Sequence, residues 1–244
     1  MPTAFAFDPA HKDLIRDDLE WRVAFGRDFL NFTEDDGKTL NSVAALVTPH
    51  PPHRVRFFLF LSIPHLVLTL LLARSDGVYS HLFEYDYTKA FFLKRNVGFS
   101  GQQITDLAQL TLDSDQIAFR KHFLRAYVAK IFTVDYEKFA TWEYFDKVAK
   151  MHTGLKDFKH RANADPLIVD LQPMTLLLGW VEDVVVAAVM DLPNETADAK
   201  VKTAVLRAFN KFMWLQNDLF NRWYAKTDEE LAAAMEKAKE AGEN

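Results

Sequence analysis

Apolar residues recur every three or four positions along most of the chain, and this spacing constrains the fold more than any other feature. Such a period places apolar side chains on one face of an α-helix. It is clear from Gln116 to Phe132, from Asp135 to Leu155 and from about Asp198 to Ala225. No stretch stands out with the two-residue period of a β-strand. The sequence therefore predicts an all-α fold.

Two helices near the C-terminal end are expected to form the centre of the domain. The run from Leu167 to Val189 is almost wholly apolar, which predicts a central and mostly buried helix. Asp165-Pro166 should mark its start, and Pro173 should kink it or delay its first turn. The next helix carries a seam at near-heptad spacing that can pack within the domain or against a partner chain. The seam consists of Val201, Val205, Ala208, Phe212, Leu215, Leu219 and Trp223.

Residue types typical of helix ends appear in the first and second thirds of the chain. Thr33, with Asp36 three residues later, is typical of a helix start. Before it, the stretch from Leu14 to Phe29 carries an imperfect apolar stripe that includes Val23. Gly154 offers a stop for the helix that begins near Asp135.

Composition narrows the function classes. The 244 residues include 21 Phe, 5 Trp and 7 Tyr, which can build a large core or line a large flat apolar cavity. There is no Cys, which excludes disulfides, zinc–thiolate sites, iron–sulfur clusters and cysteine nucleophiles.

Charge separates a nearly neutral body from an acidic end. The net charge is −5, and residues 227–244 carry most of it, with six acids and two lysines. We expect this tail to be flexible or helical, and residues 1–226 to form one domain. The body has no basic block, which argues against a nucleic-acid surface. No secretory signal is evident at the N-terminus, so we expect a cytoplasmic protein.

One segment departs from the helical pattern. Residues 48–75 read TPHPPHRVRFFLFLSIPHLVLTLLLARS and include a 17-residue apolar run from Phe57 to Ala73. Deleting the segment would join Val47 to Asp76 and restore one continuous amphipathic helix. Three interpretations are open: a retained intron translated in frame, a genuine insertion, or a membrane anchor. The short length and a Pro-His pair near the middle disfavour the anchor, and we expect the segment to be dispensable.

Three stretches occur in a fixed order: VYSHLFEYDYTKAF at 78–91, FRKHFLRAY at 119–127 and WEYFDKVAKMHTG at 142–154. With WLQNDLF at 214–220, they resemble the protoglobin and globin-sensor family, in particular its stand-alone fungal members. The resemblance covers most of Leu14 to Tyr224. It implies a globin-like fold with an extra N-terminal helix, one haem b, and binding of a diatomic gas. The hydrophobic segment at about 48–75 is a departure from the family pattern.

The resemblance also implies the residues of the haem site. His152 shares an apolar helical face with Phe145 and Val148, near the end of its helix, where a globin holds its proximal ligand. The family pattern places Tyr79 and Phe123 on the gas-binding side, where a phenol hydroxyl can donate a hydrogen bond. For each residue the alternative is ordinary: a histidine in an apolar core, a half-buried tyrosine, a packed phenylalanine.

Other histidines and bases near these positions have less specific roles. His81 and His122 are expected on the surface. The bases that could meet the haem propionates are Lys94, Arg95, Arg120 and Lys121.

Function remains divided among three classes at this level. The leading hypothesis is a non-catalytic haem protein that reversibly binds O₂, NO or CO. As a sensor it would act through a partner or a homodimer formed by the last two long helices, since the chain ends soon after them. A haem enzyme, such as an NO dioxygenase or a peroxidase, is an alternative, although no nucleotide-binding fingerprint is present. A haem-free interaction module is the third, and His152 in an apolar groove argues against it.

Overall fold

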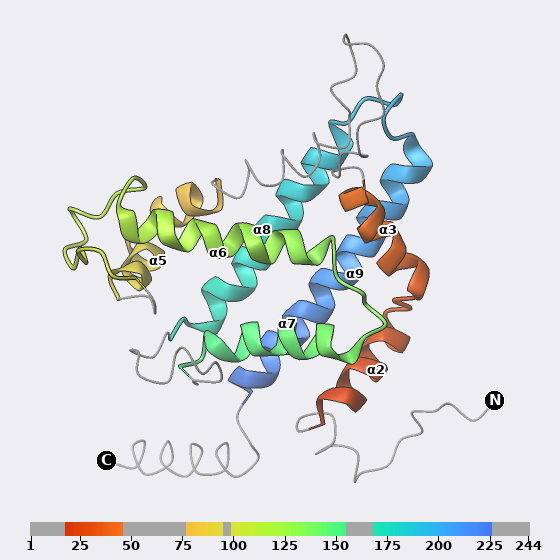
Figure 1. Ribbon diagram of the computed structural model, residues 1–244, viewed down its shortest axis with the longest axis horizontal. Coiled ribbons are helices and arrows are strands. Elements are labelled where there is room, and N and C mark those ends of the chain that lie inside the picture. Colours follow the sequence, from red (N-terminus) through yellow and green to blue (C-terminus); the bar gives the residue numbers. More distant parts are fainter. Residues whose placement is uncertain (1–17, 46–76, 95–98, 155–167, 226–244) are drawn as a thin grey trace, which may run out of the picture.

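The computed structural model describes residues 18–45, 77–94, 99–154 and 168–225, and helices dominate all four ranges (Figure 1). The only strand-type pairing within these ranges is a single antiparallel bridge between Thr153 and Ile168. The all-α prediction is confirmed. Four long helices form two layers, with α6 (Asp115–Ile131) and α7 (Phe139–Met151) lying across α8 (Leu171–Met190) and α9 (Ala199–Tyr224) (Figure 1).

Helix α9 lies at the centre of the core, as its seam predicted. It packs against α3 (Glu34–Ala45), α7 and α8. Its predicted start is confirmed, because the Asp198 carboxylate accepts the N–H of Val201 at 2.9 Å. The seam from Val205 to Leu219 is buried, whereas Val201 is exposed. The near-heptad spacing therefore serves packing within the domain.

Helix α8 is not mostly buried, and the prediction that it would be is wrong. One face packs against α9, but Leu176 and Met190 on the other face are 65% and 56% exposed. A helix that is apolar on all sides gives no sequence signal for which face is covered. By length and composition alone, α8 also meets the requirements for a membrane-spanning helix.

The start of α8 agrees with the expected effect of its proline. The helix begins at Leu171, with Asp170 at the N-cap, so Pro173 lies in the first turn. The backbone N–H groups of a first turn have no partner within the helix, so proline removes no helical bond there. The start predicted at Asp165-Pro166 lies outside the described residues.

A buried ammonium group closes the turn between α8 and α9. Lys202 is only 8% exposed, and its Nζ donates to the carbonyl oxygens of Met190 and Leu192 at 3.0 and 2.6 Å. Carbonyl groups at the end of a helix carry partial negative charge. The lysine of α9 therefore caps α8 and fastens the two helices together at this end.

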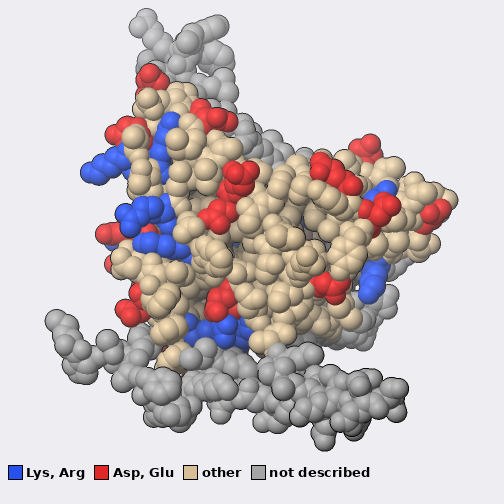
Figure 2. All heavy atoms as spheres, turned by 180° about the vertical axis from the view of Figure 1, so that it is seen from behind, with Lys and Arg blue, Asp and Glu red and all other residues tan. Residues whose placement is uncertain are grey.

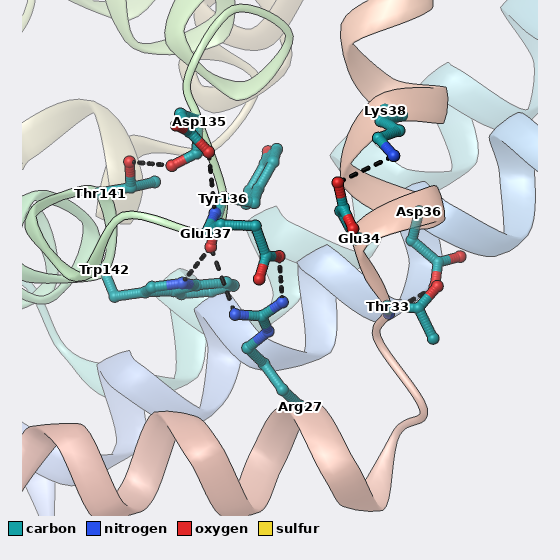
Figure 3. Close-up of polar contacts among 10 residues, drawn as sticks. All are labelled: Arg27, Thr33, Glu34, Asp36, Lys38, Asp135, Tyr136, Glu137, Thr141 and Trp142. Carbon is teal, nitrogen blue, oxygen red and sulfur yellow. Dashed lines mark hydrogen bonds and ion pairs between the residues drawn. The ribbon is translucent and has the colours of Figure 1, made fainter.

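Polar contacts from α2 (Leu19–Phe29) fix the turn between α6 and α7 (Figure 3). Arg27 donates to the carbonyl oxygen of Tyr136 at 3.3 Å and forms an ion pair with Glu137. The indole N–H of Trp142 donates to the same carbonyl at 2.9 Å. These contacts fix the first turn of α7, the helix whose last turn leads to His152.

The predicted start of α3 is also confirmed. Its helix follows Thr33, whose backbone N–H donates to the Asp36 carboxylate at 2.8 Å (Figure 3), as in a capping box. The same carboxylate pairs with Lys211 of α9 at 2.8 Å. Burial raises the pKa of Asp36, but hydrogen bonds from Lys211 and Thr33 outweigh burial and leave the pKa below its ordinary value. This pair holds α3 against α9.

The apolar stripe predicted for the first helix is only partly buried. Val23 is buried, whereas Phe29 is 77% exposed. The atypical hydrophobic segment at 48–75 and the acidic tail at 227–244 lie outside the described residues. The residues on either side of the segment are helical, in α3 and at 77–83.

Candidate functional site

A cavity of about 540 Å³ lies between the two helical layers. Its volume is in the usual range for cofactor and small-molecule sites. Helices α8 and α9 supply an apolar wall. The residues of that wall include Met174, Leu177, Leu178, Val181, Val185, Phe209, Met213 and Phe220.

His152 lies on the wall of this cavity, directly after α7. Its Nδ1 atom is 2.7 Å from the carbonyl oxygen of Val148, one turn earlier. A carbonyl oxygen can only accept, so Nδ1 carries the proton, and the lone pair of the neutral ring is on Nε2. Histidines that ligate metals typically donate their other ring N–H to such an acceptor. The geometry therefore suits Nε2 as a ligand to a metal.

The two other predicted residues of α7 have different positions. Val148 lines the cavity and supplies the carbonyl oxygen described above. Phe145 is fully buried in the aromatic core and is not among the cavity-lining residues. Its ring centroid lies 5.0 Å from that of Phe212 and 6.0 Å from that of Tyr127. Phe145 thus supports the cavity wall from behind.

Helix α7 ends directly before His152, which is earlier than the apolar spacing predicted. Helix α7 stops at Met151 rather than at Leu155. Gly154 has a φ angle of 85°, in the left-handed region that glycine adopts without strain. The predicted stop is therefore confirmed, and it leaves His152 as the C-cap residue.

Tyr79 closes another part of the cavity, together with α5 (Asp86–Ala90) and η1 (Phe91–Leu93). Its side chain is buried, and its ring centroid lies 5.5 Å from that of Phe92. Tyr79 and His152 thus line one common cavity, although they are 73 positions apart in the sequence.

The cavity opens to solvent along one stripe of α6. The exposed residues that line it are Phe123, Ala126 and Lys130. Phe123 is 50% exposed, so it lines the opening of the cavity rather than its buried interior. The covered face of α6 instead includes Ile117, next to the cavity residue Arg120. The stripe identified from the sequence is the one that faces the opening.

Charge on the described part of the cavity wall is positive. Arg120 and Lys130 are its only charged residues. The Lys130 ammonium lies at the opening, 4.3 Å from the ring centroid of Tyr144. A cation beside an apolar slot favours an anionic group, such as a carboxylate, at that position.

Two of the bases proposed for the propionates bind main-chain carbonyls instead. Arg120 is buried and donates to the Lys94 carbonyl oxygen at 2.5 Å. Lys121 donates to the Leu112 carbonyl oxygen at 3.3 Å and does not line the cavity. Arg95 lies outside the described residues.

The expectation of two surface histidines is correct for His122 and correct only in part for His81, whose side chain is 29% exposed. His122 is exposed. The His81 ring lies flat on Trp180 of α8, with centroids 4.6 Å apart and an angle of 5° between the planes. Trp180 lines the cavity. The two residues are far apart in the sequence, so no local sequence pattern could predict that their rings stack.

A buried polar pair lies behind the cavity wall. Tyr127 lines the cavity, and its hydroxyl donates to Oε1 of Gln216 at 3.0 Å. The Gln216 amide in turn donates to the Phe145 carbonyl oxygen at 3.5 Å. Burial raises the pKa of the Tyr127 phenol, so the hydroxyl remains a donor at physiological pH. Sequence reasoning did not identify Tyr127 or Lys130 as cavity residues, although both share the helical stripe of Phe123.

The comparisons with known proteins relate the chain to one known family. A family model described as protoglobin matches residues 65–230. The matched range contains Tyr79, Phe123, Phe145, Val148 and His152, whereas α2 and α3 precede it. No relative among curated proteins matches the chain.

Proposed function

The chain belongs to the protoglobin family, and from this premise we propose that it binds one haem b in the cavity between the two helical layers. The haem iron supplies an open position at which O₂, NO or CO binds reversibly. The protein then acts as a gas carrier or a gas sensor, without a catalytic step. We further propose that the protein belongs with the stand-alone fungal members of this family.

The bond between His152 Nδ1 and the Val148 carbonyl oxygen carries this proposal. It fixes the tautomer and the ring orientation that an iron ligand needs, because the proton on Nδ1 places the lone pair of the ring on Nε2. The His152 ring is also held by Phe220, whose ring centroid lies 5.5 Å away. A histidine that merely filled the core would not require this arrangement beside a cavity of about 540 Å³.

Other residues support a flat apolar group with two carboxylates. The side chains from α8 and α9 provide an apolar wall that excludes water. We assign Lys130 to a haem propionate, because it is the exposed cation at the opening. We assign Tyr79 to the gas-binding side, where its phenol hydroxyl can donate to a polar ligand, and Phe123 to the cover of the opening.

Removal of the imidazole tests the proposal. The His152→Ala protein is expected to lose stable haem uptake, measured as loss of the Soret band after reconstitution and gel filtration. The His152→Gly protein should regain the band when free imidazole is added. His122→Ala, at an exposed histidine of α6, is the matched control and should keep the wild-type spectrum. A wild-type Soret band in His152→Ala would overturn the assignment.

We also propose that the protein forms a homodimer through α8 and α9. The outer face of α8 supports this, because its exposed residues follow a heptad spacing. They are Gln172, Leu176, Gly179, Asp183, Val186 and Met190, with Ala187 exposed beside Val186. Figure 2 shows this side of the molecule, where residues other than Asp, Glu, Lys and Arg predominate, acidic side chains are scattered among them, and basic side chains lie mainly toward the edges. Exposed large apolar side chains such as Leu176, Val186 and Met190 are typical of an interface.

A further inference from the structure

The hydroxyl of Tyr224 lies between two main-chain carbonyl groups next to His152. Tyr224 is the last residue of α9. Its hydroxyl oxygen is 2.6 Å from the carbonyl oxygen of Val169 and 3.5 Å from that of His152. The end of α9 thus contacts the residue proposed to hold the iron.

The two carbonyl-bearing residues are also joined to each other. The N–H of Val169 donates to the His152 carbonyl oxygen at 2.9 Å, and Thr153 pairs with Ile168 in the antiparallel bridge. The residues directly after α7 and directly before α8 therefore form a short two-stranded link. Any displacement of the His152 main chain is transmitted to this link.

The Tyr224 hydroxyl has one proton to donate, and two carbonyl oxygens lie close to it. A phenol has a single O–H, and the shorter distance assigns that proton to the Val169 carbonyl oxygen. The His152 carbonyl oxygen is at the limit of hydrogen-bond distance, so a movement of part of an ångström would bring it within reach. Burial, with the Asp170 carboxylate nearby, raises the pKa of Tyr224 to about 12, so the hydroxyl retains its proton under physiological conditions.

We infer that Tyr224 is a positioning residue for the iron ligand: it clamps the two-stranded link and thereby couples the position of His152 to the C-terminal end of α9. The inference rests on the proposed function, since it assumes that His152 ligates haem iron. Tyr224 itself is not among the residues that line the cavity. Its effect passes through the main chain of residues 152–153 and 168–169.

Hydrogen exchange of the haem-free protein tests the clamp itself. In Tyr224→Phe, the amide of Val169 is expected to exchange about fivefold faster, because one hydrogen bond that holds the link is lost. Tyr136→Phe is the matched control, because the Tyr136 hydroxyl also donates to a buried carbonyl oxygen, that of Ile131 at 2.5 Å, but at the α6–α7 turn. It should leave exchange of the Val169 amide unchanged. Unchanged exchange in Tyr224→Phe would overturn the inference.

The iron–histidine stretching band of the reduced haem protein tests the effect on the ligand. Tyr224→Phe is expected to shift this band in resonance Raman spectra and to speed haem loss about tenfold, at the low end for an outer partner of a ligand. Tyr136→Phe should leave the band in place. A wild-type protein without haem would contradict the proposed function, whereas an unshifted band in haem-loaded Tyr224→Phe would contradict this inference alone.

Free imidazole provides a second, independent control. In His152→Gly reconstituted with haem and imidazole, the ligand has no covalent link to the main chain. Addition of Tyr224→Phe should then leave the iron–imidazole band unchanged. A shift of equal size in this background would show that Tyr224 acts on the cavity in general, and would overturn its role as a positioning residue for His152.

Discussion

At the scale of single residues, Lys130 acts as a cation at the edge of an apolar cavity. We predict that Lys130→Glu speeds haem transfer to an acceptor apoprotein about two- to fivefold, since an exposed ion pair contributes at most about 1 kcal/mol. Lys121→Glu is the control, because Lys121 also lies on α6 but donates to the Leu112 carbonyl oxygen outside the cavity. Equal effects of the two substitutions would indicate a response to net charge alone.

Removal of the Tyr127 hydroxyl is expected to lower the stability of the protein, because the partner of that hydroxyl is buried. Gln216 is 1% exposed, and its Oε1 atom would lose the donated hydrogen bond in Tyr127→Phe. We predict a loss of about 1–3 kcal/mol in the free energy of unfolding, the usual cost of a buried polar atom left without a partner. Urea unfolding of the haem-free protein measures this. Tyr144→Phe removes a hydroxyl from the same cavity wall without breaking such a pair, so a similar loss there would contradict the explanation.

At the scale of helices, substitutions at two glycines distinguish the effect of helix propensity on stability from the effect of side-chain packing. In α8, a Cβ atom at Gly179 would meet nothing within 4 Å, whereas in α2 a Cβ atom at Gly26 would lie 2.8 Å from Cδ2 of Leu215. We predict that Gly179→Ala raises the free energy of unfolding by about 0.5–1 kcal/mol, because alanine favours the helix. Gly26→Ala should lose that gain to the clash with buried Leu215. Thermal unfolding of both variants checks the order, and a larger gain at Gly26 would contradict it.

Helix bounds could be predicted where a cap or a seam is local in the sequence. Asp198 and the seam after it define α9, and Thr33 with Asp36 defines the start of α3. The exposure of α8 could not be predicted, because its apolar residues surround the whole helix and only the packed neighbours decide which face is covered. Phe123 lines the cavity as expected, but its 50% exposure could not be predicted, because the spacing along one helix does not show which residues its neighbours cover.

Some residues of the candidate site could likewise be predicted from the sequence, and others could not. His152 and Tyr79 could be identified from local sequence and family resemblance, and both line the cavity. The contacts of Tyr224 could not, since its partners Val169 and His152 are 55 and 72 positions away. A hydrogen bond to a main-chain carbonyl places no demand on the partner's side chain, so the sequence carries no trace of it.

At the scale of the whole molecule, we expect a homodimer held by the outer face of α8. Leu176→Glu combined with Val186→Glu should give a monomer in light scattering at high micromolar concentration, because each buried carboxylate would lack a partner. Phe29→Glu is the control, since Phe29 is an exposed aromatic residue of α2, away from that face. A wild-type monomer at the same concentration would contradict the dimer.

The buried ammonium of Lys202 has a mechanical consequence for such a dimer. It fastens the ends of α8 and α9 together at Met190 and Leu192, so a rotation of the pair about this end would move both helices as one lever. The opposite ends of the lever, at Val169 and Tyr224, touch the main chain of His152. Twenty residues of helix span about 30 Å, so a shift of about 1 Å at the iron ligand would rotate the pair by about 2°. In a dimer, the effect of gas binding would reach a second copy bound along α8 as a small change in the angle at which the helices of the two copies cross.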